Sequence, residues 1–279
     1  MIPFFSRMDR VYRRLTYAFL GFLLTLGIGI GTPPAAQALP WGQLILRGVQ
    51  IMQLSSLSPR QEMQIGAQID RQLQQQVRIS NNRALTAYVN EIGQRLVNAS
   101  TRSGLNYTFQ VVEDRGINAF ATMGGFVYVN RGLLEAAANE AELASVIAHE
   151  IGHIEGRHLV KQMREVAIAQ GVATAAEIDT NRAVQLGVEL ALRRPRSRQD
   201  EFDADSRGLR MLGQAGYAQS AMVSFMEKLL GRGGSMPTFL STHPNTRDRI
   251  AELRRNIDPM MATGDGLDSQ AYRDRLRSS

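Results

Sequence analysis

Apolar residues recur at intervals of three and four along much of the chain, which is the pattern of helices that bury one face. One such helix begins after Ser58, which can cap its first turn, with Pro59 at the first helical position. We expect it to continue toward Val77. A second amphipathic helix is indicated by four apolar positions in one stripe: Leu85, Val89, Ile92 and Leu96.

The pattern then changes to β-branched and aromatic residues. Residues 107–112 read Tyr-Thr-Phe-Gln-Val-Val, and residues 126–129 read Phe-Val-Tyr-Val behind a pair of glycines. We expect two or three strands of one small sheet. The next apolar stripe predicts a long, buried helix over residues 140–163.

The second half of the chain reads as helical, with segments over residues 165–192, 197–212, 218–230 and 244–256. The fold class is therefore α+β, mainly helical with a small sheet. We expect one catalytic domain over residues 58–257, and a flexible polar tail over residues 258–279.

The chain begins with the pattern of a secretory signal peptide. A basic start is followed by an apolar run from Leu15 to Ile30 and by Ala36-Gln37-Ala38. We expect residues 1–38 to be cleaved, and retention as a membrane anchor is the alternative. Residues 39–57 form an apolar connector that could lie on a membrane surface. The protein is then exported to a periplasm or an equivalent extracytoplasmic compartment.

Charge and cysteine content narrow the chemistry. The formal net charge is +6, but four arginines minus Asp9 supply +3 before residue 15, so the remainder is too small to indicate nucleic-acid binding. The chain has 0 cysteines, which excludes disulfides and thiolate zinc sites. Histidines and carboxylates remain as candidate metal ligands.

Two histidines on the central predicted helix are spaced for metal binding. His149 and His153 are four residues apart, so both rings project from one helix face toward one ion. Glu150 lies about 100° around the helix from His149, off the metal but close enough to reach an attacking water. A zinc ion lowers the pKa of water and polarises a scissile carbonyl, while a carboxylate moves the proton. This spacing predicts a hydrolytic zinc site.

A catalytic zinc site needs a third protein ligand. In the metzincin pattern Gly156 is present, but the ligand position is Leu159, and His158 is one residue out of place. We therefore interpret His158 as a solvated histidine or one behind a ligand. Glu201 and Asp205 share a face of a later helix, where Glu201 could bind zinc and Asp205 could hold a ligand histidine. On spacing alone, an exposed acidic face explains them equally well.

An ordered set of motifs resembles the HtpX / CAAX prenyl protease family of gluzincin zinc metallopeptidases, particularly its soluble, exported BepA-like branch. The resemblance runs through most of the mature chain that is expected to begin near Leu39. Its motifs are the segments 57–62, 118–121, 124–133, 149–153, 197–205 and 241–244 together with Arg247.

The resemblance implies a mainly helical gluzincin domain with the small sheet beside the active-site helix. It implies one Zn²⁺ per chain, held by His149, His153 and Glu201, with Glu150 as catalytic base and Asp205 behind a ligand histidine. Integral members of the family carry transmembrane helices, whereas residues 165–192 hold five acidic or basic side chains that a bilayer disfavours. A soluble helical cover over the cleft is the role expected for that segment.

The resemblance also places His243 near the metal. There it could stabilise an oxyanion or occupy the open coordination position as a latch, and Arg247 could assist it. The alternative is that His243 only caps the helix that follows Pro244.

Seven residues are expected to line the cleft, where a sheet edge pairs with an extended substrate and demands little of its sequence. The alternative is that these strands only complete the core. The residues are Asn118, Ala119, Phe120, Gly124, Gly125, Phe126 and Val127.

Three functions are consistent with these features. The first is an endopeptidase that cuts misfolded or misassembled exported proteins, and it is favoured because a pure binding protein has no need of Glu150. The second is a chaperone-like protein that holds clients while proteolysis is weak or latched. The third is a structural zinc protein, for which only His243 would supply the fourth ligand.

Overall fold

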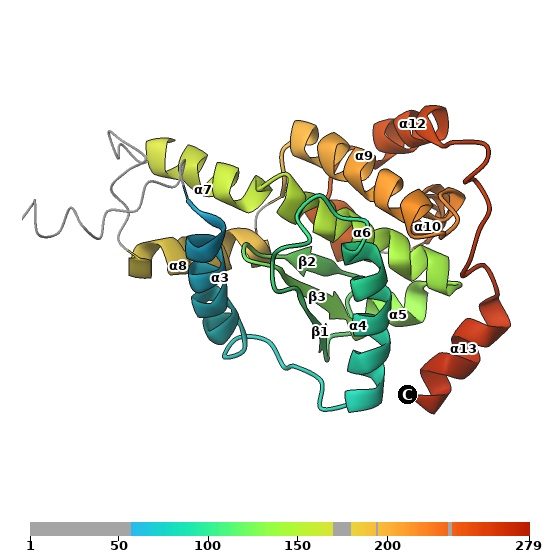
Figure 1. Ribbon diagram of the computed structural model, residues 1–279, viewed down its shortest axis with the longest axis horizontal. Helices are drawn as coiled ribbons and strands as arrows, with labels where there is room; N and C mark the ends of the chain where they lie inside the picture. Colours follow the sequence, from blue (N-terminus) through green and yellow to red (C-terminus); the bar gives the residue numbers. More distant parts are fainter. Residues whose placement is uncertain (1–56, 170–179, 194, 234–235) are drawn as a thin grey trace, which may run out of the picture. The chain divides into compact units, whose positions relative to one another are not determined.

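The computed structural model describes residues 57–169, 180–193, 195–233 and 236–279 (Figure 1). The predicted signal peptide and nearly all of the apolar connector lie outside these residues, as does the middle of segment 165–192. Among the described residues, no helix combines the length and the apolar character needed to cross a bilayer.

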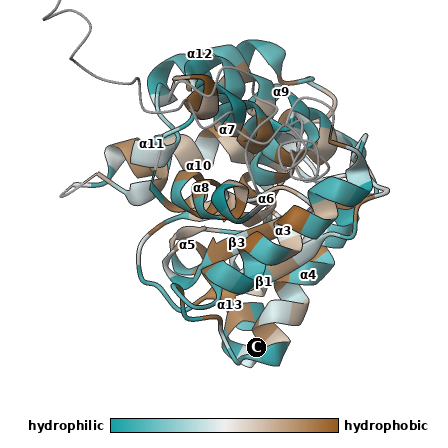
Figure 2. Ribbon diagram, turned by 90° about the vertical axis from the view of Figure 1, so that its left-hand side faces the viewer, coloured by the Kyte–Doolittle hydropathy of each residue, from teal (hydrophilic) through white to brown (hydrophobic). Residues whose placement is uncertain are grey.

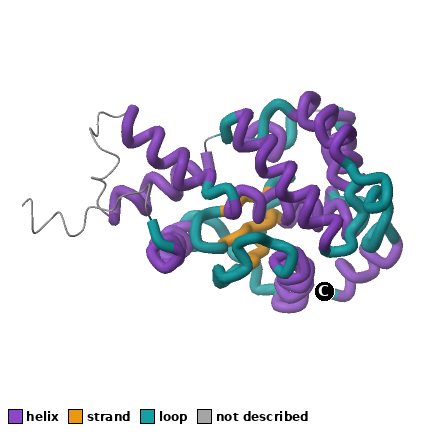
Figure 3. The backbone as a smooth tube through the Cα atoms, turned by 45° about the horizontal axis from the view of Figure 1, so that its top comes forward, coloured by secondary structure: helices purple, strands orange, loops and turns teal. Residues whose placement is uncertain are grey.

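The predicted small sheet is present, and its strand pairing is mixed. It consists of β1 (Thr108–Val112), β2 (Ala119–Ala121) and β3 (Phe126–Asn130) in the order β1-β3-β2. β1 pairs with β3 in parallel, with Thr108 opposite Phe126, and β2 pairs with β3 antiparallel. Figure 3 shows these strands enclosed by helices. β2 therefore forms one edge of the sheet.

Helices account for most of the described chain. Before the sheet come α3 (Pro59–Leu73), which starts with the expected capping box at Ser58, and α4 (Arg83–Val97). After the sheet come α5 (Arg131–Ala136), α6 (Glu140–Glu155), α7 (His158–Ala169), α8 (Thr180–Arg193), α9 (Arg198–Gln214), α10 (Ser220–Gly231), α11 (Thr238–Thr242), α12 (Thr246–Asn256) and α13 (Ser269–Ser278).

The two faces of the sheet contribute to two apolar clusters. Val127 and Val129 of β3 face the larger cluster, which includes side chains of α4, α6 and α10. Tyr128 faces the other way, into a cluster with α3, α7 and α8. This alternation is the period of two expected for a strand that is covered on both sides. Figure 2 shows hydrophobic and hydrophilic residues together on most helices, as their amphipathic patterns predict.

α6 is the central helix, and every residue from Ala141 to Glu155 is buried. It packs along α9, and the two backbones approach closely at Gly152. A Cβ atom at Gly152 would lie 2.5 Å from the carbonyl oxygen of Ala204. Only glycine permits this separation, which places residues of the two helices within hydrogen-bond distance of each other.

The single helix predicted over residues 140–163 is wrong in one respect, because the structure divides it into α6 and α7. Gly156 ends α6, and Arg157 adopts a left-handed φ of 54° before α7 begins at His158. Arg157 Nη2 lies 2.6 Å from Glu62 Oε1 and also donates to the carbonyl of Leu57. These contacts with residues far away in the sequence offset the cost of the left-handed conformation of Arg157, which is uncommon for residues other than glycine.

The polar tail predicted after residue 257 contains a helix that was not predicted, because its end forms α13 (Ser269–Ser278). Asp268 caps this helix by accepting from the amides of Gln270 and Ala271. Tyr272 is its one buried side chain, and its hydroxyl donates to the carbonyl of Leu134 at 2.7 Å. A single aromatic anchor in a polar segment does not produce an apolar stripe, which is why the sequence pattern missed the helix.

We expect Tyr272→Ala to lower the free energy of unfolding by about 3 kcal/mol, since it removes a buried aromatic ring. Urea denaturation followed by circular dichroism measures the change. Arg273→Ala, at an exposed neighbouring position, is the matched control and should shift stability by less than about 0.5 kcal/mol. Equal stability of the two variants would show that α13 contributes nothing to the fold.

Candidate metal centre

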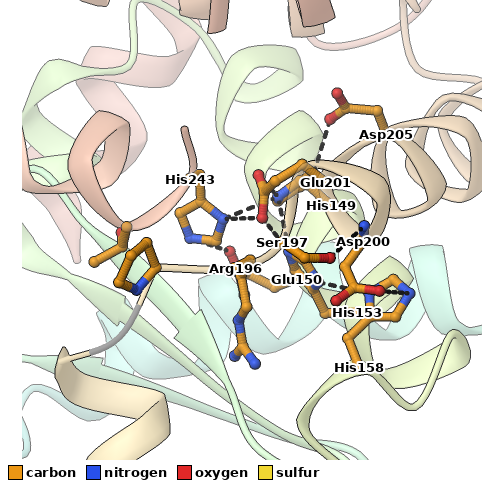
Figure 4. Close-up of polar contacts among 12 residues, drawn as sticks. His149, Glu150, His153, His158, Arg196, Ser197, Asp200, Glu201, Asp205 and His243 are labelled. Atoms are coloured by element: carbon orange, nitrogen blue, oxygen red, sulfur yellow. Dashed lines mark hydrogen bonds and ion pairs between the residues drawn. The ribbon is translucent and has the colours of Figure 1, made fainter. Parts of the chain in front are cut away.

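Four buried side chains converge between α6 and α9. His149 and His153 project from α6, Glu201 from the first turn of α9, and His243 from the residue after α11 (Figure 4). Each offers one ligand atom, and these atoms all lie within 4.8 Å of one another. The three expected ligands therefore meet at one point, and His243 joins them.

The spacing of these atoms fits a zinc ion. Four ligands about 2.0–2.1 Å from zinc, at the corners of a tetrahedron, are separated by about 3.3–3.4 Å. His149 Nε2 lies 3.0 Å from His153 Nε2 and 3.2 Å from His243 Nδ1. The carboxylate of Glu201 lies 3.5, 3.3 and 3.2 Å from His149 Nε2, His153 Nε2 and His243 Nδ1, respectively. Nitrogen and carboxylate donors in this arrangement are typical of zinc sites without cysteine.

The charges around the four residues favour a cation. Burial and the charge of Arg249 oppose protonation of His149, but hydrogen bonds to Asp205 and Glu201 raise its pKa to about 9. Burial lowers the pKa of His153 well below its usual range, which favours the neutral ring that binds metal. Burial also opposes ionisation of Glu201, yet His243 and Arg249 hold its pKa well below the usual range.

Glu150 lies beside this cluster and is completely buried. Neither of its carboxylate oxygens has a hydrogen-bond partner among the described residues. His243 Nε2 lies 3.4 Å from Glu150 Oε1. A buried carboxylate without hydrogen-bond partners carries a desolvation cost.

Asp205 holds His149 from behind. Its Oδ1 lies 2.9 Å from His149 Nδ1, which leaves Nε2 facing the other ligands. Burial would raise the pKa of Asp205, but the charge and hydrogen bonds of Arg249 outweigh it and lower that pKa. This is the place that the resemblance implied for Asp205.

Arg249, which the sequence analysis did not identify, is the organising residue of the site: it contacts Asp205, Glu201 and the main chain of His243. Its guanidinium is fully buried and contacts both oxygens of Asp205 at 2.7 Å, and its Nη1 lies 2.6 Å from Glu201 Oε2. The same Nη1 donates to the carbonyl of His243 at 3.1 Å. One side chain of α12 thus binds the carboxylates of α9 and the main chain that carries His243.

Arg247, which we expected near His243, is exposed and lines a separate pocket with Leu240 and Pro244. The periodicity of α12 could have distinguished the two arginines. Its buried positions are Thr246, Arg249, Ile250 and Leu253, a spacing of three and four that includes Arg249 and leaves out Arg247.

The residues predicted to line a cleft divide into two groups. Ala119 and Phe120 lie in the edge strand β2, which packs against α6, and Asn118 Oδ1 accepts a 3.4 Å hydrogen bond from Thr242, next to His243. By contrast, Gly124 and Gly125 form the turn before β3, where they pack on α3 and on the residues before β1. Phe126 is partly exposed at the start of β3, and Val127 is buried in the central strand.

A small pocket lies beside His153, at the end of β2. It is lined by Ala121 and Met123, by residues of α6 and α7, and by Arg196. Arg196 is buried, and its Nη2 donates to the carbonyl of Ala121 at 3.3 Å. Its backbone amide donates to the carbonyl of Thr242. Arg196 therefore connects the edge strand to the segment that carries His243.

Comparison with known proteins identifies relatives of this chain. The model of peptidase family M48 matches residues 83–257. The beta-barrel assembly-enhancing protease of Escherichia coli (strain K12) is 33% identical over 222 residues, which cover 74% of this chain and 46% of that protein. The putative beta-barrel assembly-enhancing protease of Vibrio cholerae is 32% identical, over 80% of this chain and 50% of that protein. The mitochondrial metalloendopeptidase OMA1 of Schizosaccharomyces pombe is 30% identical, over 60% of this chain and 52% of that protein. The chain spans about half the length of these curated relatives.

We expect Arg249→Met to lower the free energy of unfolding by about 3–5 kcal/mol, because it leaves Asp205 and Glu201 as buried charges without their partner. Arg247→Met is the matched control on the same helix and should change stability by less than about 0.5 kcal/mol. Thermal and urea unfolding of both variants measure the difference. A larger loss for Arg247→Met would contradict the assignment of Arg249 as the organising residue.

Proposed function

Because the chain belongs to peptidase family M48, we propose that it is a zinc-dependent endopeptidase whose single Zn²⁺ is held by His149, His153 and Glu201. The observation that carries this proposal is the buried convergence of these ligands beside Glu150, whose carboxylate has no hydrogen-bond partner among the described residues. A purely structural metal site would not require the carboxylate of Glu150.

The chain's own residues divide the work of peptide hydrolysis. When bound, zinc supplies Lewis acidity that polarises the scissile carbonyl and acidifies water. Glu150 accepts the proton of the attacking water and delivers it to the leaving amine. Asp205 fixes the ring of His149, and Arg249 holds Asp205 and Glu201 in place. Burial of all these groups strengthens their electrostatic interactions.

His243 is proposed to act as a latch on this centre. Its Nδ1 lies 3.2 Å from both His149 Nε2 and Glu201 Oε1, a separation that suits a fourth ligand. In that position it occupies the place where a substrate carbonyl would bind. The alternative role, stabilisation of an oxyanion, requires the ring to move away from the other ligands.

The proposed substrates are misfolded or misassembled exported proteins. An extended chain of almost any sequence is proposed to pair with the edge strand β2, which contains Ala119 and Phe120. Asn118, which lies beside this strand and accepts a hydrogen bond from Thr242, is proposed to contact the substrate as well. The relatives named for beta-barrel assembly support this class of substrate.

The proposed compartment is the periplasm or an equivalent extracytoplasmic space, with association at a membrane surface through the apolar connector. The signal-peptide pattern of residues 1–38 supports export. The names of the bacterial relatives refer to beta-barrel assembly and are consistent with this location.

A second candidate function is a chaperone-like protein that binds unfolded clients while its proteolysis is latched. The observation that favours it is the position of His243 among the ligands, because a fourth protein ligand closes the centre to substrate. The two functions share the edge strand and differ in whether clients are cut.

We expect Glu150→Gln to bind zinc at one ion per chain but to cleave casein about 10²–10⁴-fold more slowly, because the proton acceptor is lost. Metal analysis and a casein assay measure the two properties. Glu201→Ala should instead lower the zinc content itself. Casein cleavage by Glu150→Gln at the wild-type rate would rule out the proposed mechanism, and undiminished zinc in Glu201→Ala would rule out the ligand role.

We expect His243→Ala to retain zinc and to cleave casein several-fold faster than wild type, because removal of a fourth ligand opens the centre to substrate. Ser241→Ala, an exposed neighbour of the same segment, should leave the rate unchanged. A slower rate for His243→Ala contradicts the latch and supports oxyanion stabilisation. An unchanged rate excludes both roles.

A further inference from the structure

His153 is held from behind by a different group from the one that holds His149. Its Nδ1 lies 2.8 Å from Nδ1 of His158, the first residue of α7. His158 is buried, with 3% of its surface exposed, so this contact is shielded from water. Of the two alternatives expected for His158, a solvated histidine or one behind a ligand, the structure shows the second, because the ring contacts His153 and is not in solvent.

The positions of the protons in this contact follow from the ligand geometry. His153 Nε2 faces His149 Nε2 and Glu201, so the Nε2 lone pair is reserved for the metal. The proton of the neutral His153 ring is then on Nδ1, and His158 Nδ1 must accept it. The proton of His158 is consequently on Nε2, which faces Asp203 Oδ2 at 3.0 Å.

Asp203 is suited to accept the hydrogen bond from His158 Nε2. It lies on α9, and the same Oδ2 accepts from Arg207 Nε at 2.6 Å, which fixes the carboxylate. Asp200 also lies near His158, but its Oδ1 is 3.8 Å from Nε2, beyond hydrogen-bond distance, and pairs with Lys161 at 2.7 Å. Asp203 is therefore the hydrogen-bonding carboxylate of this arrangement.

We propose that His158 and Asp203 are positioning residues for the zinc ligand His153, forming a His153–His158–Asp203 relay. The relay orients the ring of His153 and keeps its proton on Nδ1, as Asp205 does for His149. This inference rests on the proposed zinc function, and it assigns to His158 and Asp203 a role in the affinity of the centre for its metal.

Gly156 provides independent support for the relay. Its φ of −74° and ψ of −6° are accessible to any residue, so the backbone does not require glycine there. A Cβ atom at this position, however, would lie 2.2 Å from His158 Nε2 and 2.8 Å from Asp203 Oδ2. The missing side chain therefore leaves room for the hydrogen bond between His158 and Asp203.

The relay also places a carboxylate away from the buried centre. Glu150, Glu201 and Asp205 are already buried there, and each additional charge in a dry environment carries a desolvation cost. The neutral ring of His158 spans the distance from His153 to Asp203, whose side chain is 41% exposed. Water can thus solvate the final acceptor while His153 keeps a fixed hydrogen-bond partner.

The test measures zinc affinity by competition between the metal-free protein and a chromophoric chelator. His158→Phe retains an aromatic ring but no acceptor, and we expect about 10–100-fold weaker zinc binding. His158→Asn places an amide oxygen near the position of Nδ1, so its affinity should remain within about threefold of wild type. Gly156→Ala and Asp203→Ala should each weaken binding by about tenfold. Asp248→Ala, an exposed acidic residue on α12, is the control and should have no effect.

A purely structural role for His158 predicts a different order. Filling of the buried space would make His158→Phe the better-tolerated variant and His158→Asn the worse one, in both thermal stability and zinc binding. Affinity equal to wild type in His158→Phe, or affinity as weak in His158→Asn as in His158→Phe, would overturn the relay. If His158→Phe does not fold, the comparison of Asp203→Ala with Asp248→Ala decides, and equal affinities overturn the relay. Failure of the wild type to bind zinc would overturn the proposed function as well, so the two failures are distinguishable.

Discussion

The close approach of α6 and α9 is the constraint on which the rest of the site depends. Glycine at position 152 lets the backbone of α6 reach the carbonyl of Ala204. At that separation Glu201 and Asp205, one turn apart on α9, meet His149 and His153, one turn apart on α6. A wider spacing would leave the carboxylates too far away to share an ion with the imidazoles. Helix packing, rather than a flexible loop, thus sets most of the ligand geometry.

Concentrating charge between two helices creates an electrostatic cost that other elements offset. Arg249 of α12 forms ion pairs with Glu201 and Asp205 of α9 and offsets part of their charge, while the relay through His158 keeps Asp203 at the surface. Glu150 is the exception, since no described residue donates to it. Glu150, the group proposed for proton transfer, therefore has no hydrogen-bond donor among the described residues. Asp205 and Glu201, by contrast, are held in place by Arg249.

Local patterns predicted the parts of the molecule that depend on local physics. The i, i+4 spacing of His149 and His153 follows from helical periodicity, and the small sheet follows from its β-branched residues. The ligand role of Glu201 could be expected only from the resemblance to a family. The sequence pattern of an acidic helix face is the same whether that face is solvated or buried. The break at Arg157 depends on Glu62, nearly a hundred residues away, and α13 depends on one tyrosine. Arg247 does not lie beside His243, because the buried face of α12 carries Arg249 instead.

The hydrogen bond from Arg249 to the carbonyl of His243 limits how that histidine can leave the metal centre. Opening the whole segment would break a charge-assisted bond to a fully buried guanidinium, whereas rotation about the side-chain torsions of His243 leaves it intact. The ring of Phe239 stacks on His243, with centroids 4.5 Å apart, and opposes that rotation. Release of His243 from its proposed place as fourth ligand would then be a rotamer change within a fixed main chain. It would break the contact with Phe239 together with those to His149 and Glu201, but no hydrogen bond of the main chain.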